Sequence, residues 1–402
     1  MAEPSTPVAT ASITTPTPMT PTEPADLAVD MVERVRSLSY YHGLLGRHDV
    51  EPLLKAEGDF LLRKSEVKGQ IVITLAVRAA KGIKHFLLNQ NEQNQFYFES
   101  HFEPTINELI EWHVKNQAPV SQQSGVKLKS AVERPPWLLN HDSVRMSKKL
   151  GEGAFGEVYM AVYTSDGVPQ KVAIKTIRGE VSREERLKFM KEARLMRKLS
   201  NKYIVKILGV AVHEHPLMIV MELCLGGSML GYLRKHKGQD ILSTKLRFCY
   251  ESAVGLAYLE KQGFIHRDIA ARNCLLSEKN EVKISDFGMS DERKLLQDDK
   301  LDKVPVKWLA PETMQNKIYS NKTDVWSYGI MAWEIYADGA EPYPGLTNIQ
   351  TRAKIIVQNY RMTMPTGTPA GVIKLVEKCW LLQPNDRPSF ESIVKTLEPL
   401  LT

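Results

Sequence analysis

The sequence is short of several features that would define a fold or a location. Only four cysteines occur in 402 residues, and they lie far apart, so neither a CxxC-type zinc site nor a dense disulfide framework is available. No apolar run approaches the roughly 18 residues of a membrane span, and no basic-then-apolar signal sequence opens the chain. The 53 basic and 47 acidic residues are interspersed, which disfavours a nucleic-acid partner. We therefore expect a cytoplasmic globular protein with reduced thiols and no transmembrane segment.

Hydroxyl side chains are missing from one stretch in the last third of the chain. Residues 286–312 read DFGMSDERKLLQDDKLDKVPVKWLAPE, and no serine, threonine or tyrosine lies between Asp291 and Glu312. The two ends resemble the activation segment of a protein kinase, which runs from DFG to APE. Such segments usually contain a hydroxyl residue whose phosphorylation orders the loop. If the chain is a kinase, this segment needs another source of order.

Composition divides the chain into four parts. Residues 1–36 are rich in Pro, Thr, Ser and Ala and have no aromatic residue. We expect this part to be mostly disordered, because it cannot bury enough apolar surface to offset the entropy of ordering. Two consecutive prolines interrupt regular structure within residues 129–143, which we interpret as a linker. Folded units are expected at 38–128 and 144–402.

The first folded unit has strand-like and helix-like patterns in turn. Apolar strand patterns occur at 58–65, 70–80, 84–89 and 95–99, and helical patterns at 46–58 and 105–116. The second helix would bury one face formed by Ile106, Leu109, Ile110 and His113. The order predicts an α+β fold, an antiparallel sheet flanked by two helices. Arg63 stands inside the strand run FLLRKS, where burial is costly unless an anion such as phosphate meets the guanidinium.

The strings YHG, GDFLLRKS and KHFLL together resemble an SH2 domain. The resemblance implies that Arg63 forms the centre of a phosphotyrosine pocket. It further implies that Arg47 gives a second phosphate contact, that Ser65 adds a hydrogen bond and that His85 flanks the phenol ring. Tyrosine-phosphorylated proteins would then be the partners of this unit. The alternative, an SH2 shell that no longer binds its ligand, is disfavoured because the arginines are present.

The second folded unit contains six motifs in the order of the protein-kinase signature set. They are LGEGAFGEVY (150–159), KVAIK (171–175), LKFMKEARLM (187–196), IHRDIAARNCLL (265–276), KISDFGMS (283–290) and APE (310–312). The order and spacing of all six indicate a bilobal protein-kinase domain, for which no single motif would suffice.

Each motif residue has an expected task in phosphoryl transfer. Lys175 would hold the α- and β-phosphates of ATP and pair with Glu192. Asp286 would bind the magnesium ion that bridges the β- and γ-phosphates, and Asn273 would hold a second metal ion. Asp268 would orient the acceptor hydroxyl and take its proton. The cofactors are therefore ATP and Mg²⁺, or Mn²⁺.

A further set of residues is expected to surround the nucleotide or to form scaffold. Glycines let backbone amides approach phosphate oxygens. The expected ATP-binding residues are Leu150, Gly151, Gly153, Gly156, Val158, Ala173, Lys175, Glu222, Cys224 and Leu275, with Glu222 and Cys224 supplying backbone hydrogen bonds at the hinge. The expected scaffold residues are an ion pair of Glu312 with Arg387, the catalytic-loop anchor Asp324, and the core thiols Cys274 and Cys379.

The catalytic loop indicates which hydroxyl is phosphorylated. HRDIAARN has Ala270 two residues after Asp268 and Arg272 four residues after it. With VPVKWLAPE, this resembles the tyrosine-kinase class, in which a platform around Trp308 would hold the substrate backbone. The strings SGVKLKSAV, WLLNHDSV, YPGLTNIQTR and RPSF resemble the Fes/Fer family, which implies a catalytic role for Arg272 as well. Residues 1–36 have no counterpart of that family's F-BAR and coiled-coil region, so neither curvature sensing nor coiled-coil oligomerisation is expected.

Two hypotheses account for the activation segment. In the first, Asp298 and Asp299 supply a permanent negative charge that pairs with Arg267 of the HRD motif. In the second, a shortened loop folds without any charged latch. In both, switching of catalysis by phosphorylation of this segment is absent. We expect a non-receptor protein-tyrosine kinase that its SH2 domain targets and activates, recruited by partners to the inner face of the plasma membrane. The alternatives are a catalytically weak SH2–pseudokinase adaptor and, more distantly, a serine/threonine kinase.

Overall fold

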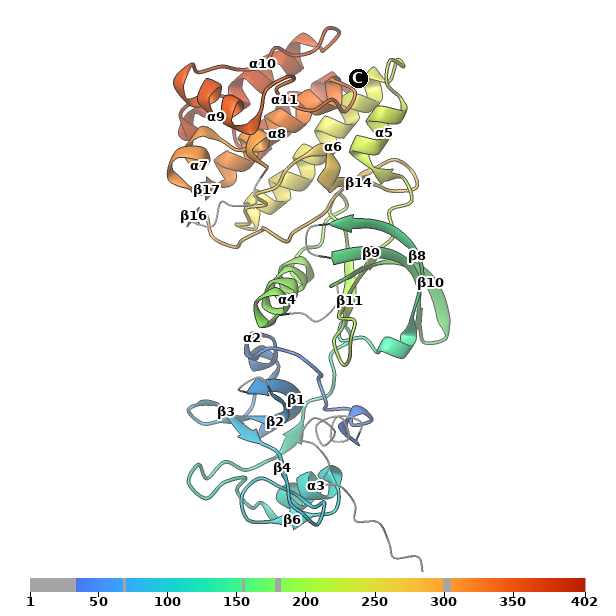
Figure 1. Cartoon of the computed structure of the whole chain (residues 1–402), viewed down its shortest axis with the longest axis vertical. Coiled ribbons are helices and arrows are strands. Elements are labelled where there is room, and N and C mark those ends of the chain that lie inside the picture. The colour runs from blue at the N-terminus through green and yellow to red at the C-terminus, as the bar shows by residue number, and fades with distance from the viewer. Residues whose placement is uncertain (1–33, 68–69, 154–155, 178–181, 299–304, 402) are drawn as a thin grey trace, which may run out of the picture. The chain divides into compact units, whose positions relative to one another are not determined.

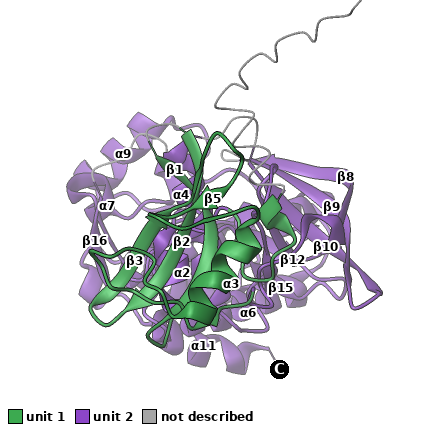
Figure 2. Cartoon of the chain, turned by 90° about the horizontal axis from the view of Figure 1, so that it is seen from below, with its two compact units in different colours: residues 1–43, 53–133 green, residues 44–52, 134–402 purple. Residues whose placement is uncertain are grey.

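The computed structural model describes residues 34–67, 70–153, 156–177, 182–298 and 305–401 (Figure 1). The chain divides into two compact units, one made of residues 1–43 and 53–133 and the other of residues 44–52 and 134–402 (Figure 2). Within the described ranges, no helix is long and apolar enough to cross a membrane.

A four-stranded sheet with the order β3-β2-β1-β7 forms the centre of the first unit. Its strands are β1 (Asp59–Val67), β2 (Gln70–Ala79), β3 (Gly82–Leu87) and β7 (Ser130–Ala131). The strands β1, β2 and β3 pair antiparallel, whereas β7 pairs parallel to β1. The predicted antiparallel sheet is therefore confirmed for β1, β2 and β3, and two residues assigned to the linker add a short parallel strand at its edge.

Helix α3 (Ile106–Asn116) packs against one face of this sheet. The four α3 residues predicted to face inward are all buried. Thr105 caps the helix by accepting a hydrogen bond from the Glu108 amide at 3.2 Å. Three short strands form a second sheet beside it: β4 (Asn89–Gln90), β5 (Phe96–Tyr97) and β6 (Phe102–Glu103).

Two expectations for the start of the chain need correction. Residues 34–36 are helical, and Val35 is 0% exposed within the core of the first unit, so the disordered tail was predicted to run too far. Residues 1–33 lie outside the described residues. The helix predicted over 46–58 is only α2 (Arg47–Val50) with a 3₁₀ turn at Glu51–Leu53, because Pro52 has no amide hydrogen to continue the α-helical bonding.

The second unit begins with a five-stranded antiparallel sheet in the order β11-β12-β10-β9-β8. The strands are β8 (Val144–Gly153), β9 (Gly156–Ser165), β10 (Val168–Thr176), β11 (Ile207–Ala211) and β12 (Met218–Glu222). Helix α4 (Arg183–Arg197) follows β10. A capping box starts this helix: Ser182 accepts from the Glu185 amide, and the Glu185 side chain accepts from the Ser182 amide.

Helices dominate the remainder of the second unit (Figure 1). They are α5 (Met229–Lys235), α6 (Leu242–Lys261), α7 (Pro311–Asn316), α8 (Asn321–Tyr336), α9 (Asn348–Val357), α10 (Ala370–Cys379) and α11 (Phe390–Leu397). Two small sheets lie among these helices. One has the strand order β13 (Gly227–Ser228), β14 (Cys274–Leu276) and β15 (Val282–Ile284), and the other pairs β16 (Leu295–Gln297) with β17 (Ile318–Ser320). Almost every residue of α8 is buried, as expected for a central helix.

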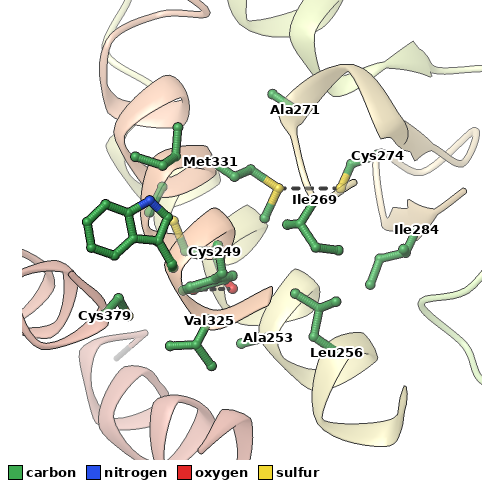
Figure 3. Close-up of a cluster of buried hydrophobic side chains, with 14 of the residues drawn as sticks. Cys249, Ala253, Leu256, Ile269, Ala271, Cys274, Ile284, Val325, Met331 and Cys379 are labelled. Atoms are coloured by element: carbon green, nitrogen blue, oxygen red, sulfur yellow. Dashed lines mark hydrogen bonds between the residues drawn. The ribbon is translucent and has the colours of Figure 1, made fainter. Parts of the chain in front are cut away.

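Figure 3 shows how the helical core supports the loop between α6 and β15. Side chains of α6, α8 and α10 meet those of the segment that leads into β14. Cys274 is buried there and its thiol lies 3.6 Å from the sulfur of Met331, and Cys379 is also buried. Burial raises the pKa of both thiols to about 12, so the prediction that they are core thiols is confirmed.

Candidate functional site

A buried ion pair joins the sheet of the second unit to helix α4. Lys175 on β10 donates through Nζ to both carboxylate oxygens of Glu192, at 2.7 and 2.8 Å. Burial raises the pKa of the Glu192 carboxyl, and Lys175 opposes this shift. Burial also lowers the pKa of Lys175, but the Glu192 and Asp286 carboxylates more than offset it, so this pKa lies above its usual value. The predicted pairing of these two residues is confirmed.

Asp286 is a second carboxylate beside the same lysine. Its Oδ1 lies 3.5 Å from Lys175 Nζ, and the amide of Gly288 points to it at 3.4 Å. The backbone of Asp286 is in the left-handed region, with φ of 60°, which is uncommon outside glycine and frequent at functional sites. Phe287 is buried with its ring edge-on to that of His266, at a centroid separation of 5.0 Å.

The loop between α6 and β14 gathers the three predicted catalytic polar groups. Asn273 donates through Nδ2 to the backbone carbonyl of Asp268 at 2.8 Å and to its carboxylate at 2.7 Å. Arg272 forms an ion pair with the Asp268 carboxylate. The Arg272 guanidinium also lies over the ring of Trp308, 4.5 Å from its centroid, within the range of a cation–π contact. The structure thus brings the acid, the amide and the arginine together.

Two carboxylates on α8 accept hydrogen bonds from the backbone of this loop. Asp324 accepts hydrogen bonds from the amides of His266 and Arg267, at 2.7 and 2.9 Å, so its predicted role as an anchor is confirmed. Glu334 accepts from the Ala271 amide at 3.1 Å and from Trp308 Nε1 at 2.9 Å. Burial raises the pKa of each carboxyl to about 7.

Glu334 is a residue that the sequence analysis missed. It connects the catalytic loop to Trp308, the platform residue before APE. One signal was available: a lone acid in the apolar run YGIMAWEIY. A charged residue on an otherwise apolar helix is seldom buried without a polar partner.

The residues expected around adenine line the strands near Lys175. In the sheet register, Val158 lies opposite both Lys175 and Gly151, and Ala173 lies opposite Met221. Gly156 has no room for a side chain, because a Cβ atom would come within 1.9 Å of the Thr176 carbonyl oxygen. This close approach explains that glycine without reference to phosphate.

The hinge residues have contacts that limit what they offer a ligand. The Glu222 side chain accepts from the Lys206 amide at 2.7 Å and from Lys283 at 2.9 Å, and the Glu222 amide bonds to the Lys206 carbonyl. Leu150 is exposed, whereas Leu275 and Cys224 are half-buried. Any contribution of Glu222 to a nucleotide therefore comes from its carbonyl oxygen.

The donor set near Asp268 fits a hard divalent cation. Asp286 offers a half-exposed carboxylate, and Asn273 uses its amide nitrogen for Asp268, so its remaining amide atom is an oxygen. Magnesium takes oxygen ligands and is commonly held by one or two side chains together with substrate phosphates. These two residues match that requirement.

The activation segment supports the first hypothesis made for it. Arg267 Nη2 donates to Asp298 Oδ2 at 2.7 Å. Asp299 lies outside the described residues. The predicted ion pair at the end of the segment also exists, since Arg387 donates to both carboxylate oxygens of Glu312 at 2.7 and 2.8 Å.

Polar side chains gather on one face of the first unit's sheet. Arg63 pairs with Thr74 and Ser65 with Val72 across β1 and β2, and His85 pairs with Ala76 across β2 and β3. Because cross-strand partners share a face and residues two apart do too, Arg63, Ser65 and His85 lie on the same face. The core residues Phe60 and Leu62, one position out of phase, pack on the opposite face.

Burial on this face is consistent with an anion site. Arg63 is 7% exposed, and the Ser65 hydroxyl is buried with no hydrogen-bond partner among the described residues. The remaining predicted phosphotyrosine contact, Arg47, begins α2, which groups with the second unit. In that unit, Asp49 of α2 accepts hydrogen bonds from Arg194 at 3.0 and 3.1 Å and from Arg197 at 3.3 Å, both on α4.

Comparison with known proteins gives the same division of the chain. Residues 144–397 match the family described as protein tyrosine and serine/threonine kinase. Residues 40–113 match the SH2 domain family. The kinase match alone covers more than half of the 402 residues.

Individual relatives align with most of the chain. Fer-related kinase 1 of Caenorhabditis elegans is 56% identical over 372 residues, which cover 91% of this chain and 95% of that protein. Tyrosine-protein kinase Fer of Mus musculus is 39% identical over 362 residues. The transforming protein Fps of Fujinami sarcoma virus, a tyrosine-protein kinase, is 38% identical over 378 residues. The matched regions cover 89% and 93% of this chain but only 43% and 42% of those two proteins.

Proposed function

We propose, for a chain that belongs to the Fes/Fer family of SH2-containing protein-tyrosine kinases, that it transfers the γ-phosphoryl group of ATP to protein tyrosines at the site described above. The observation that supports this most directly is the double hydrogen bond between Lys175 and Glu192, with Asp286 beside it. Phosphoryl transfer in kinases requires this ion pair and the DFG aspartate in place at the same time.

The site residues act mainly by positioning and by charge. Lys175 holds the α- and β-phosphates, and the apolar side chains of Leu150, Val158, Ala173 and Leu275 enclose the adenine ring. Asp286 and Asn273 are the residues that hold magnesium, which offsets the charge of the β- and γ-phosphates. Asp268 orients the acceptor hydroxyl and accepts its proton.

The residues around Asp268 select tyrosine over serine as the acceptor. Arg272 is tied to the Asp268 carboxylate and lies over Trp308, and Glu334 holds the indole of Trp308 against the catalytic loop. A tyrosine hydroxyl reaches about 6–7 Å from its Cα, much further than a serine hydroxyl. A rigid platform at Trp308 keeps the substrate backbone at that longer distance.

The polar face of the first unit binds phosphotyrosine in partner proteins. Arg63 supplies the buried guanidinium, Ser65 adds a hydroxyl and His85 flanks the ring; Arg47 provides a second cation. Phosphotyrosine binding targets the enzyme and activates it, because the short linker of residues 129–143 ties the two domains together at a high effective concentration. The enzyme works in the cytoplasm, as its four unbridged cysteines suggest, and meets membranes through its partners.

The catalytic proposal is tested by turnover. The full chain is incubated with Mg-ATP and a tyrosine-containing polymer, and phosphate incorporation is measured beside the Asp268→Asn variant. The wild type is expected to phosphorylate tyrosine, and the variant to lose roughly 10²–10⁴-fold in kcat, the contribution of a positioned base. Wild-type protein that binds ATP without turnover would instead identify a pseudokinase adaptor, and phosphate on serine would contradict the tyrosine assignment.

The binding proposal is tested by calorimetry with a phosphotyrosine peptide. Arg63→Ala should weaken binding about a hundredfold or more, because it removes one partner of a desolvated charge pair. Lys64→Ala is the matched control, since Lys64 is the next residue on β1 and lies on the opposite face. Binding that is equally weakened in both variants would show that only the positive charge of the strand matters.

A further inference from the structure

The activation segment has an unusual composition for a segment that must be ordered to act. From Asp291 to Glu312 the sequence contains no side chain with a hydroxyl. Phosphorylation within this range therefore cannot create the anion that pairs with the HRD arginine in many kinases. The described part of the segment, up to residue 298, is nevertheless bonded to the rest of the second unit.

Arg267 is a buried cation with a side-chain exposure of only 8%. Its guanidinium donates through Nη2 to Asp298 at 2.7 Å and through Nη1 to the Met289 carbonyl at 3.2 Å. It also lies over the Tyr319 ring, 4.0 Å from the centroid. A charge buried to this extent needs an anionic partner, and among the described residues Asp298 is the carboxylate within ion-pair distance.

Asp298 is presented by a strand rather than by an isolated loop. It follows β16 directly, and β16 pairs antiparallel with β17 from Leu295↔Ser320 to Gln297↔Ile318. The Asp298 amide continues this pairing by donating to the Lys317 carbonyl at 3.1 Å. Leu296 is buried beneath the strand. These contacts fix the backbone from which the carboxylate reaches Arg267.

The other acids of the segment have different partners. Asp291 accepts from Lys191 at 2.9 Å and from Arg293 at 2.7 Å, and Glu292 accepts from Lys198 at 2.5 Å. Lys191 and Lys198 both lie on α4. The contact with the HRD arginine is therefore specific to Asp298 among the described acids of the segment.

Arg267 transmits this contact to the reacting groups through one peptide bond. It precedes Asp268 and has φ of 73°, a strained conformation for a long side chain. Asp324 accepts a hydrogen bond from the Arg267 amide, and Asp298 of the activation segment accepts one from the Arg267 side chain. Loss of either hydrogen bond lets the residue relax and shifts the Asp268 carboxylate.

We propose that Asp298 is a positioning residue that takes the place of an activation-segment phosphate, so that the kinase is active without phosphorylation of this segment. The proposal rests on the proposed function, because it concerns the regulation of the same site. The substitution is partial. A carboxylate has less charge and fewer acceptor oxygens than a phosphate, and Arg267 Nε is buried without a hydrogen-bond partner among the described residues.

The first experiment removes the charge at Asp298 and, separately, at Glu292 of the same segment. Asp298→Asn should lower kcat about tenfold, the value of one charge-assisted hydrogen bond, while the KM for ATP and the Tm stay close to those of the wild type. Glu292→Gln removes an acidic charge of the same segment that pairs with Lys198 instead of Arg267 and should leave kcat unchanged. Equal losses in the two variants, or a KM change without a kcat change, would overturn the proposal.

A double-mutant cycle then tests whether the effect passes through Arg267. In an Arg267→Met background, Asp298→Asn should cost no further activity; an undiminished tenfold loss would overturn the proposal. Wild-type enzyme treated with a phosphatase should keep its activity, whereas lasting inactivation would show that a phosphate is required. Wild-type enzyme that never turns over under any condition would refute the proposed function, a result that none of the variant comparisons can mimic.

Discussion

Two sets of acidic side chains hold the catalytic loop and its surroundings, and they do so by different means. The acids of α8, Asp324 and Glu334, are buried and bond mainly to backbone amides and an indole. The acids of the activation segment, Asp291, Glu292 and Asp298, bond to lysine and arginine side chains. Both sets join parts of the second unit that are far apart in the sequence.

The pKa shifts of the two α8 acids and of Asp291 have opposite directions. Burial raises the pKa of Asp324 and of Glu334 to about 7 because amide dipoles compensate only part of the lost hydration. Hydrogen bonds from Arg293 and Lys191 hold the pKa of Asp291 well below its usual range, although burial opposes them. The α8 acids therefore hold the loop at an electrostatic cost, whereas Asp291 is stabilised as an anion.

The largest effect is expected from Asp324→Ala. The variant leaves two buried amides, those of His266 and Arg267, without their acceptor, which costs about 3 kcal/mol of the free energy of unfolding. Chemical denaturation of the full chain measures this loss in the transition of the kinase unit. Asp324→Asn keeps one acceptor oxygen and should lose about half as much. An alanine variant as stable as the wild type would show that water satisfies these amides.

The pH dependence of stability sharpens the contrast. A carboxyl whose pKa rises on folding binds protons more tightly in the folded state between pH about 4 and 7. Glu334 therefore contributes stability at low pH that is lost as the pH rises through about 7. The glutamine of Glu334→Gln cannot ionise. Between pH 5 and 8 the free energy of unfolding of this variant should therefore fall by on the order of 2 kcal/mol less than that of the wild type.

The comparison with wild type isolates this group from others that titrate nearby. Burial lowers the pKa of His266, and this contribution is the same in wild type and variant to a first approximation. The segment acid Asp291 should behave oppositely, because its stabilising contribution is lost only as the pH falls below about 4. Parallel pH profiles for wild type and Glu334→Gln would contradict the raised pKa of Glu334.

Sequence reasoning succeeded where chemistry dictates a residue type at a fixed spacing. The pairing of Lys175 with Glu192 could be predicted because both residues stand in motifs of a fixed order and spacing. The pairing of Arg267 with Asp298 could be given only as one of two hypotheses, since a carboxylate in a loop has many possible partners. The contacts of Lys191 and Lys198 with the activation segment could not be predicted, because α4 and that segment are about a hundred positions apart and meet only in the folded unit.

The fold shows the same limit. The inward face of α3 follows from periodicity and was predicted correctly. The burial of Val35 and the parallel pairing of Ser130 with Asp59 depend on where the chain passes after folding. Neither residue stands in a local pattern that distinguishes it from a tail or a linker.

The smallest effect is expected from Glu292→Gln, and it tests whether burial rather than distance decides the value of a contact. The ion pair of Glu292 with Lys198 is shorter than that of Asp291 with Lys191, at 2.5 against 2.9 Å. Yet Glu292 is 41% exposed, whereas Asp291 is 8% exposed. Solvent and salt screen exposed pairs, which contribute about 0–1 kcal/mol. Asp291→Asn should therefore cost about 1 kcal/mol, and Glu292→Gln less than about 0.5 kcal/mol.

Salt provides the control for this pair of variants. Raising the salt concentration to about 1 M shortens the screening length to about 3 Å, so the small cost of Glu292→Gln should vanish while most of the cost of Asp291→Asn persists. Both values come from denaturant unfolding of the full chain at pH 7. If Glu292→Gln proved the more costly variant, distance rather than burial would rank the segment's contacts. The Asp298 side chain is 29% exposed, so the stability cost of Asp298→Asn should lie between the costs of these two variants. If Asp298→Asn lowers kcat by more than this stability cost explains, Asp298 positions the catalytic loop rather than only stabilising the activation segment.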